Sequence, residues 1–253
     1  MQDRSDLSGL FPPLSPVARL PQKAKRGWGA RIAARARGLA VCAASVSAVL
    51  LGSGEARSNE GAFLSSRMTV SAPAGASNLC TRYTWACARS ASVTPVSPAQ
   101  MTLAATLNRQ INRQVRSVSD QAQYGKQEHW ALPTARGGDC EDFALLKKKR
   151  LMQAGVDPQN LLITTALDRR RNAHAVLIMR TPQGDFVLDN LRDDIVHWQR
   201  TGYTFLRMQN PANPALWTAV IEGGILRNDN AVSTPRVAQV NRNVRQAAET
   251  YSR

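Results

Sequence analysis

A short stretch in the middle of the chain places two glycines, three carboxylates and a cysteine directly before an apolar helical run. It reads Gly137-Gly138-Asp139-Cys140-Glu141-Asp142-Phe143-Ala144-Leu145-Leu146. Asp139 can cap a helix by accepting a hydrogen bond from the backbone N–H of Asp142, so we expect a helix from Cys140 to Ala154, ended by Gly155. In the first turn, the unpaired N–H groups and the helix dipole favour a thiolate. A nucleophile benefits from that position, whereas a buried structural cysteine does not.

Hydrophobic patterns on both sides of this helix predict an α+β fold. Ser97 can cap an earlier helix that runs to about Val115, and residues 117–130 are expected to form a connecting loop. The charged run Lys147–Arg150 is expected to face solvent on the nucleophile helix. Apolar and β-branched runs predict strands at 161–167, 174–179, 185–188, 195–198, 203–208 and 217–221. The helices precede a series of antiparallel strands, so we expect the nucleophile helix to pack on an antiparallel sheet.

The charge distribution and composition divide the chain into four parts. Residues 1–56 carry 8 Lys or Arg against 3 Asp or Glu and contain a short apolar run, Gly38–Leu51, which is typical of an export leader or an N-terminal anchor. We therefore expect a periplasmic protein. Residues 57–78 are predicted to be a flexible lead-in, 79–226 the folded domain and 227–253 a polar tail.

The net charge of +15 raises the question of an acidic partner, a nucleic acid or an anionic membrane. Aromatic residues make up only 6% of the chain, and the basic residues are scattered with few aromatics among them. This composition argues against a nucleic-acid partner and favours a solvated, arginine-rich surface.

Three cysteines remain outside the predicted leader. The spacing of Cys80 and Cys87 predicts a local disulfide in an exported chain, the alternative being two buried free thiols. Cys140 is then the unpaired thiol, which supports its interpretation as a nucleophile.

A thiolate nucleophile needs a base, and the base needs an orienting acceptor. His174 opens the first strand of a predicted hairpin and Asp189 follows the second strand, so Cys140, His174 and Asp189 can form a triad. Asp189 lies two to three residues from the position opposite His174, a distance of roughly 7–10 Å that a bulge or twist must close. His129 and His197 compete for the role of base. A zinc site formed by the same three residues is an alternative, although the spacing is not typical of a metal site.

An oxyanion hole for this triad would include the backbone N–H of Cys140. The sequence leaves the second donor open among Gln127, His129 and Trp130.

Three segments of the chain resemble the bacterial transglutaminase-like cysteine proteinases, the family that includes the LapG-type periplasmic proteases. The segments are Gly138-Asp139-Cys140-Glu141-Asp142-Phe143, His174-Ala175-Val176-Leu177 and Phe186-Val187-Leu188-Asp189-Asn190, with further matches at Trp130, Ala131, Pro133, Gly202, Tyr203, Phe205 and Trp217. The resemblance implies a papain/transglutaminase-like fold, a Cys-His-Asp triad and hydrolysis of peptide bonds. In the LapG-type branch it also implies cleavage of large cell-surface adhesins near paired alanines, and release of a biofilm.

The same resemblance implies a metal and a partner. LapG-type enzymes bind calcium through carboxylates of this motif, which correspond to Asp139, Glu141 and Asp142. Such carboxylates suit a hard cation, and helix capping is the alternative explanation for them. Trp130 matches the position at which LapG-type enzymes contact an inhibitory receptor of the inner membrane.

The sequence therefore supports one leading hypothesis and two rivals. The leading hypothesis is an exported cysteine endopeptidase that uses Cys140, His174 and Asp189. The first rival is a transglutaminase or acyl transferase with the same triad, in which an amine replaces water. The second is a non-catalytic binding module that keeps the fold.

Overall fold

A computed structural model of the chain describes residues 61–226. These residues form a seven-stranded sheet in the order β1-β7-β6-β2-β3-β4-β5, and every neighbouring pair of strands is antiparallel. The predicted leader (1–56) and polar tail (227–253) lie outside the described residues. Within residues 61–226, no helix has the length and hydropathy needed to cross a membrane.

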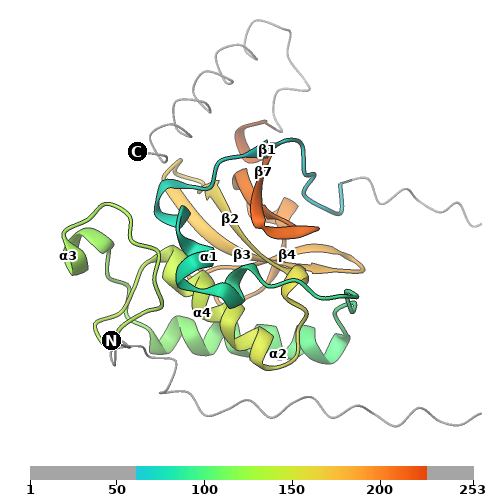
Figure 1. Cartoon of the computed structure of the whole chain (residues 1–253), viewed down its shortest axis with the longest axis horizontal. Helices are drawn as coiled ribbons and strands as arrows, with labels where there is room; N and C mark the ends of the chain where they lie inside the picture. The colour runs from blue at the N-terminus through green and yellow to red at the C-terminus, as the bar shows by residue number, and fades with distance from the viewer. Residues whose placement is uncertain (1–60, 227–253) are drawn as a thin grey trace, which may run out of the picture. The chain divides into compact units, whose positions relative to one another are not determined.

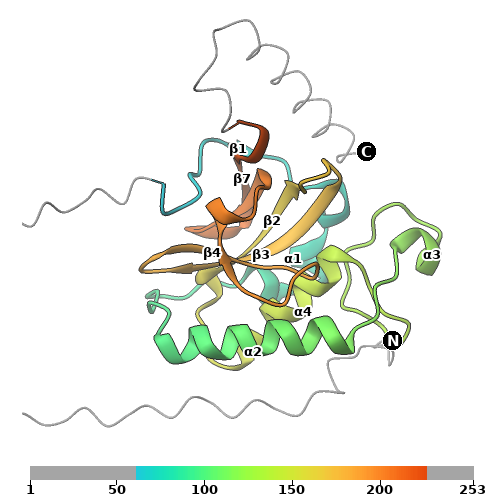
Figure 2. The same cartoon turned by 180° about the vertical axis from the view of Figure 1, so that it is seen from behind.

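The α-helices lie together on one side of the sheet (Figures 1 and 2). They are α1 (Leu79–Arg82), α2 (Pro98–Gln114), α3 (Asp120–Tyr124) and α4 (Cys140–Gln153). The 3-10 helices are η2 (Ala74–Ala76), η3 (Thr84–Cys87), η4 (Pro158–Asn160) and η5 (Trp198–Arg200), and Trp198 of η5 packs in the core on the other face. The cap predicted for α2 is present, because the Ser97 hydroxyl accepts a hydrogen bond from Gln100 N–H while the Gln100 side chain accepts one from Ser97 N–H. The helix α4 packs mainly against β3, β2 and α2.

The sheet has two apolar faces. Its strands are β1 (Thr69–Val70), β2 (Leu161–Leu167), β3 (Ala173–Thr181), β4 (Gly184–Leu188), β5 (Val196–His197), β6 (Thr204–Asn210) and β7 (Asn213–Gly223). Alternate residues of β2 and β3, such as Ile163 and Leu177, join the helices in one core, while Leu162 and Val176 join a second core on the other face. Both cores exclude water from the strands between them, so β2 is buried along its whole length.

The domain begins earlier than the boundary predicted at Leu79. Leu64 is only 1% exposed and packs in the second core, and β1 pairs with β7 at the edge of the sheet. From residue 61 onward, the predicted flexible lead-in is therefore part of the fold. The helix α3 was also missed, since it lies inside the segment predicted to be a loop.

The charged run on α4 does not face solvent as predicted. Lys147 and Lys148 are both 0% exposed and Arg150 is also buried, whereas Lys149 is half-buried over the ring of Trp85. The reason is tertiary, because the sheet, α2 and η3 together cover α4 on several sides. The pattern of charged residues along a helix does not show which of its faces pack against other elements.

Candidate functional site

The structure brings His174 and Asp189 into direct contact. In the β3–β4 hairpin, pairing runs from Thr181 opposite Gly184 to Leu177 opposite Leu188 and then stops. Asp189 leaves the ladder at this point, and its Oδ1 lies 2.8 Å from Nε2 of His174. The strand register alone predicts a wider separation between His174 and Asp189. The two side chains meet because β4 ends at Leu188, and no bulge is needed. Because Nε2 is engaged by the carboxylate, Nδ1 is the ring nitrogen left to exchange a proton with a nucleophile.

Three donors converge on the buried carboxylate of Asp189. Besides His174, the backbone N–H of Leu191 donates to Oδ1 at 3.0 Å and the hydroxyl of Tyr203 donates to Oδ2 at 2.6 Å. Burial by itself raises the pKa of Asp189, but these hydrogen bonds outweigh it and hold the pKa below its usual range. The Tyr203 ring also packs edge-on against His174, with 5.6 Å between ring centroids. Asp189 is thus an anion fixed in position.

The loop that follows Asp189 is tied to α2 by the side-chain amides of Asn108, which is buried, and Asn112, which is half-buried. Asn112 Nδ2 donates to the carbonyl oxygens of Asp189 and Arg192, at 2.9 Å in each case. Asn108 Nδ2 donates to the carbonyl oxygens of Arg192 and Asp193, at 3.0 Å in each case. Residues 189–193, named the Asp189 loop here, are therefore held against the helical layer.

Cys140 is the first residue of α4 and lies beside the strand that carries His174. Its Sγ accepts a hydrogen bond from the backbone N–H of Ala175, at 3.3 Å, and lies 3.2 Å from Oε2 of Glu141. Burial and the charges of Glu141 and Asp139 raise the pKa of the Cys140 thiol well above its usual value. The sequence predicted the opposite direction from the helix dipole; burial of the thiol, the largest contribution, and the adjacent carboxylates act against that dipole.

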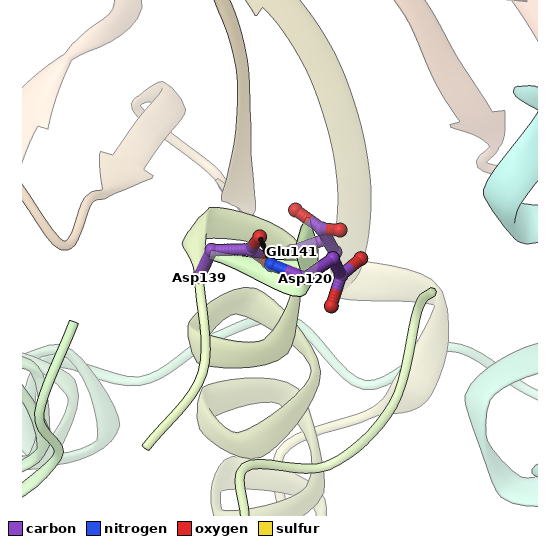
Figure 3. A group of neighbouring side chains, drawn as sticks. All are labelled: Asp120, Asp139 and Glu141. Atoms are coloured by element: carbon purple, nitrogen blue, oxygen red, sulfur yellow. Dashed lines mark hydrogen bonds between the residues drawn. The ribbon is translucent and has the colours of Figure 1, made fainter. Parts of the chain in front are cut away.

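Three carboxylates gather at the start of α4. One ligand atom from each of Asp120, Asp139 and Glu141 lies within 4.8 Å of the others (Figure 3). Oδ1 of Asp139 is buried without a hydrogen-bond partner. Burial and the neighbouring carboxylates raise the pKa of Asp120 to about 6 and that of Glu141 well above its usual value. Hard oxygen donors with an unused acceptor atom and unbalanced negative charge fit a divalent cation such as calcium.

This group differs from the predicted calcium ligands at one position. Asp142 is not a member, since its Oδ1 accepts a hydrogen bond from the backbone N–H of Ala131 at 2.9 Å. Asp139 occupies the N-cap position of α4 but makes no capping bond there; its Oδ2 accepts from the backbone N–H of Asp120 at 3.0 Å. The predicted cap is therefore replaced by a link from Asp139 to α3.

Asp120 is the member of this carboxylate group that the sequence did not indicate. Its Oδ2 accepts a hydrogen bond from the backbone N–H of His129, which fixes the carboxylate toward α4. A local signal was present, because Ser119 caps α3 by accepting from Ala122 N–H at 3.3 Å. That signal predicts a helix start, but it does not reveal that α3 meets a motif 19 residues further on.

Trp130 is buried and is not available as a contact surface for a receptor. It is 1% exposed, packs edge-on against Trp217, and donates its indole N–H to Glu128 at 3.0 Å. Of the other candidate oxyanion donors, the His129 ring lies 3.4 Å from Nη1 of Arg82, whereas Gln127 is exposed.

The predicted disulfide is confirmed. Cys80 in α1 and Cys87 in η3 are bonded, and among the described residues Cys140 is the free cysteine. The bond closes a short loop that packs on α4 and β7 through η3.

Comparison with known proteins gives the family. The sequence pattern of the family described as bacterial transglutaminase-like cysteine proteinase BTLCP matches residues 66–224, which is more than half of the chain. The chain belongs to this family. It is therefore a cysteine peptidase of the transglutaminase-like type, and the α+β fold predicted from the sequence is confirmed.

Solved structures of Legionella pneumophila LapG are also similar to part of this chain, at 27% identity and a TM-score of 0.41. The calcium-bound structure is matched over 52% of this chain and 76% of its own, the EGTA-treated structure over 49% and 69%, and a third LapG structure over 51% and 72%. A comparison with curated protein sequences gives no match.

Proposed function

We propose that this protein is an exported endopeptidase in which Cys140 is the nucleophile, His174 the general base and acid, and Asp189 the residue that orients the imidazole. The main support is the direct contact between Nε2 of His174 and Oδ1 of Asp189, at 2.8 Å. Ala175, the next residue of β3, donates its backbone N–H to Sγ of Cys140, so the base and the thiol lie side by side. A base with a fixed orientation beside a thiol at a helix start is the arrangement that acyl transfer by a cysteine requires.

The residues act in two stages. His174 takes the proton of the thiol at Nδ1, and the sulfur of Cys140 attacks the scissile carbonyl carbon. The C–N bond then breaks, His174 gives the proton to the leaving amine, and a thioester remains on Cys140. A water molecule, deprotonated by His174, attacks the thioester carbonyl carbon. The C–S bond then breaks, the acid leaves, and His174 returns the proton to the sulfur of Cys140. Asp189 stays ionised throughout and stabilises the imidazolium.

We further propose that Asp120, Asp139 and Glu141 hold a calcium ion. When bound, the ion supplies positive charge that balances the three carboxylates beside the nucleophile. Two of the effects that raise the pKa of Cys140, the charges of Glu141 and Asp139, are then offset.

The proposed location and substrate rest on different support. The basic, apolar pattern of residues 1–56 is typical of export, and the Cys80–Cys87 disulfide suits an oxidising compartment. We propose the periplasm as the location and a protein at the cell surface, such as a large adhesin, as the substrate. An inner-membrane receptor that regulates the enzyme would have to use a surface other than the buried Trp130.

The test combines a thiol probe with a search for cleavage. Purified full-length protein is alkylated with iodoacetamide at several pH values, with calcium or with EGTA, and modification is read at the Cys140 peptide by mass spectrometry. The same protein is then incubated with a diverse peptide library, and newly formed termini are sequenced. In calcium, which offsets the charges of Glu141 and Asp139, we expect alkylation of Cys140 well below the pH at which a free cysteine, with a pKa near 8.5, reacts, and new termini at a limited set of positions.

Matched variants separate the hypotheses. Cys140→Ala should give no new termini, and His174→Ala should abolish the alkylation at low pH. Alkylation that is unaffected by His174→Ala would overturn the triad and leave a binding module. Addition of a small primary amine tests the acyl transferase, because an amide of that amine in place of a free acid would overturn hydrolysis as the main reaction. Alkylation indifferent to EGTA would overturn the calcium proposal alone.

A further inference from the structure

Three consecutive arginines lie in the loop that connects β2 to β3. Residues 168–172, named the arginine loop here, contain them at positions 169–171. The loop closes the β2–β3 hairpin directly before the proposed base, since Ala166 of β2 pairs with His174 of β3. Arg171 is three residues from His174, so at most about 10 Å of chain separates them. The arginine loop therefore lies beside the proposed triad.

The carboxylate of Asp168 fixes the backbone of the arginine loop. Its Oδ1 accepts hydrogen bonds from the backbone N–H groups of Arg170 at 2.7 Å and of Asn172 at 2.8 Å. Its Oδ2 accepts from the side-chain amide of Asn172 at 3.0 Å. The backbone N–H of Arg171 also donates to the carbonyl oxygen of Asp168, at 3.0 Å. Asp168 thus gives the loop a defined shape, and its acceptor atoms are used by the loop backbone and by Asn172.

The first of the three arginines attaches the loop to the segment that supports the triad. Nε of Arg169 donates to the carbonyl oxygen of Thr201 at 2.8 Å, and the Thr201 hydroxyl accepts from the backbone N–H of Tyr203 at 3.0 Å. Tyr203 in turn donates to Asp189 and packs against His174. The arginine loop is therefore held in a fixed position relative to the proposed base and its carboxylate.

The other two arginines are exposed and have no counter-ion in the described part of the chain. Within residues 61–226, neither Arg170 nor Arg171 forms an ion pair. Arg171 also has a φ of 67°, in the left-handed region that glycine and asparagine adopt more readily than a long side chain. An arginine at this position is thus less favourable for the fold than an asparagine would be, which points to a role for its side chain in binding.

We propose that Arg170 and Arg171 bind an acidic segment of the protein substrate next to the bond that Cys140 attacks. The inference rests on the proposed function, because it specifies the substrate of that site. Two guanidinium groups on a fixed loop attract carboxylates and can bind them through paired hydrogen bonds. The thiol is close to them in the fold, since its Sγ accepts from the N–H of Ala175, four residues after Arg171. The alternative is a solvated arginine surface without a ligand.

Two alkylating probes of different charge measure the electrostatic potential at Cys140. Iodoacetate is an anion and iodoacetamide is neutral, and both react with the thiolate, so the ratio of their rates does not depend on the pKa of the thiol. The full-length protein is used in calcium at an ionic strength of about 0.01 M, where the Debye length is about 30 Å. We expect the ratio of iodoacetate to iodoacetamide rates to fall about twofold in Arg170→Gln or Arg171→Asn, and about fourfold in the double variant.

The same variants separate binding from folding. Asparagine tolerates the left-handed backbone, so Arg171→Asn should keep or raise the Tm while it lowers the rate ratio. Salt provides a further check on the electrostatic origin of the effect. At an ionic strength of about 1 M, where the Debye length is about 3 Å, the parent and the double variant should give the same ratio.

Arg89→Gln is the matched control, because it removes the same charge from an exposed residue far from the site. Ser90, the next residue, donates its N–H to Gln159 at 2.9 Å, and Gln159 lies just before β2. The seven residues of β2 separate this position from the arginine loop by about 23 Å. We therefore expect the ratio in Arg89→Gln to stay within about 1.3-fold of the parent.

An acidic peptide tests whether the loop binds a polypeptide as well as a small anion. A hexaglutamate peptide, acetylated and amidated at its ends, should slow the alkylation of Cys140 by iodoacetamide at least about twofold in the parent. The same peptide should have no effect in the double variant of Arg170 and Arg171. The matched hexaglutamine peptide should protect neither protein.

Three results would each overturn the proposal: a double variant with the parent rate ratio, an equal fall in Arg89→Gln, or a parent that hexaglutamate does not protect. Protection that persists in the double variant would also assign the peptide to another surface. A failure of the proposed function gives a different pattern, in which the peptide library yields no new termini or His174→Ala leaves Cys140 alkylation unchanged. Neither the rate ratio nor the protection needs turnover, so the arginine loop can be judged in that case as well.

Discussion

The Tyr203 hydroxyl donates a hydrogen bond of 2.6 Å to Oδ2 of Asp189, while the ring of the same tyrosine packs edge-on against His174. One side chain thereby contacts both the base and its orienting carboxylate. Tyr203 leads into β6 and Asp189 follows β4, so the contact connects two segments of the sheet that are not adjacent strands. The proposed triad is thus supported from outside its own hairpin.

Tyr203→Phe should lower the rate of peptide cleavage more than the loss of a tyrosine hydroxyl elsewhere in the domain. The variant keeps the ring against His174 but removes one of three donors to Asp189, and a hydrogen bond to a charged group contributes about 2 kcal/mol. We expect kcat/KM for a cleaved peptide to fall at least about tenfold, with a Tm a few degrees lower. Tyr83→Phe is the control, because the Tyr83 hydroxyl accepts from Leu132 N–H at 3.1 Å, in a different part of the helical layer. It should lower the Tm without changing kcat/KM; an equal loss of rate in both variants would contradict the prediction.

Asp189→Asn should separate orientation from folding. The amide has nearly the same shape, but it carries no charge and cannot accept from all three donors. We expect kcat to fall about 100-fold or more, as happens when the carboxylate of such a triad is neutralised. The matched control is Asp185→Asn in the same strand pair, since Asp185 is fully buried and accepts from Arg180 and from Leu64 N–H. That variant should lose stability and keep kcat. A parent-like kcat in Asp189→Asn would remove Asp189 from the proposed mechanism.

Several elements of the fold could be predicted from the sequence because the residues that determine them are close together in the chain. The capping sequence at Ser97 predicts α2, and the β-branched run of 161–167 predicts β2 with the observed bounds. The proximity of His174 and Asp189 follows from a short hairpin, whose register is fixed by its two-residue turn. In each case the interacting residues are close in sequence, so a pattern of a few residues contains the information.

The rest depends on contacts between distant segments. Asp120 joins Asp139 and Glu141 only because α3 folds back onto the start of α4. Lys147 and Lys148 appear solvated in the sequence because charge predicts exposure, whereas packing on several sides of α4 buries them. The direction predicted for the Cys140 pKa was wrong for the same reason, since the helix dipole is a local effect, whereas burial of the thiol, which raises its pKa most, comes from packing.

The carboxylates around α4 predict an unusual dependence of stability on pH when no cation is bound. Burial raises the pKa of Asp142 from an ordinary value of 3.8 to about 8. A carboxyl group with a raised pKa in the folded state stabilises the fold below its ordinary pKa, and this contribution is lost as the pH rises through the folded-state value. For Asp142 the loss extends from about pH 4 to about pH 8, and for Asp120 it extends to about pH 6.

The check is a series of thermal unfolding curves between pH 5 and pH 8, in EGTA. Asp142→Asn keeps an acceptor for Ala131 N–H without the charge, so we expect its Tm at pH 8 to exceed that of the parent by at least about 3 °C. The difference should shrink toward pH 5, where the parent carboxyl is already protonated. Calcium should raise the Tm of the parent more at pH 8 than at pH 5. A difference between variant and parent that does not change with pH would contradict the assigned direction of the Asp142 pKa.

The N-terminal boundary of the domain gives the last prediction. Leu64 fills the core on the face of the sheet away from the helices, its N–H donates to Asp185 at 2.9 Å, and its carbonyl accepts from Arg180 at 3.1 Å. A chain that begins at Leu79 loses these contacts together with β1, which leaves a buried aspartate with fewer partners and β7 as an open edge. We expect a chain of residues 61–226 to unfold cooperatively and a chain of residues 79–226 to unfold at least about 10 °C lower or to aggregate.

Leu64→Ala in the longer chain isolates the packing contribution of this side chain and should lower the free energy of unfolding by about 2–4 kcal/mol. Equal Tm values for the two chains would mean that residues 61–78 are dispensable for the fold, as the sequence alone had indicated.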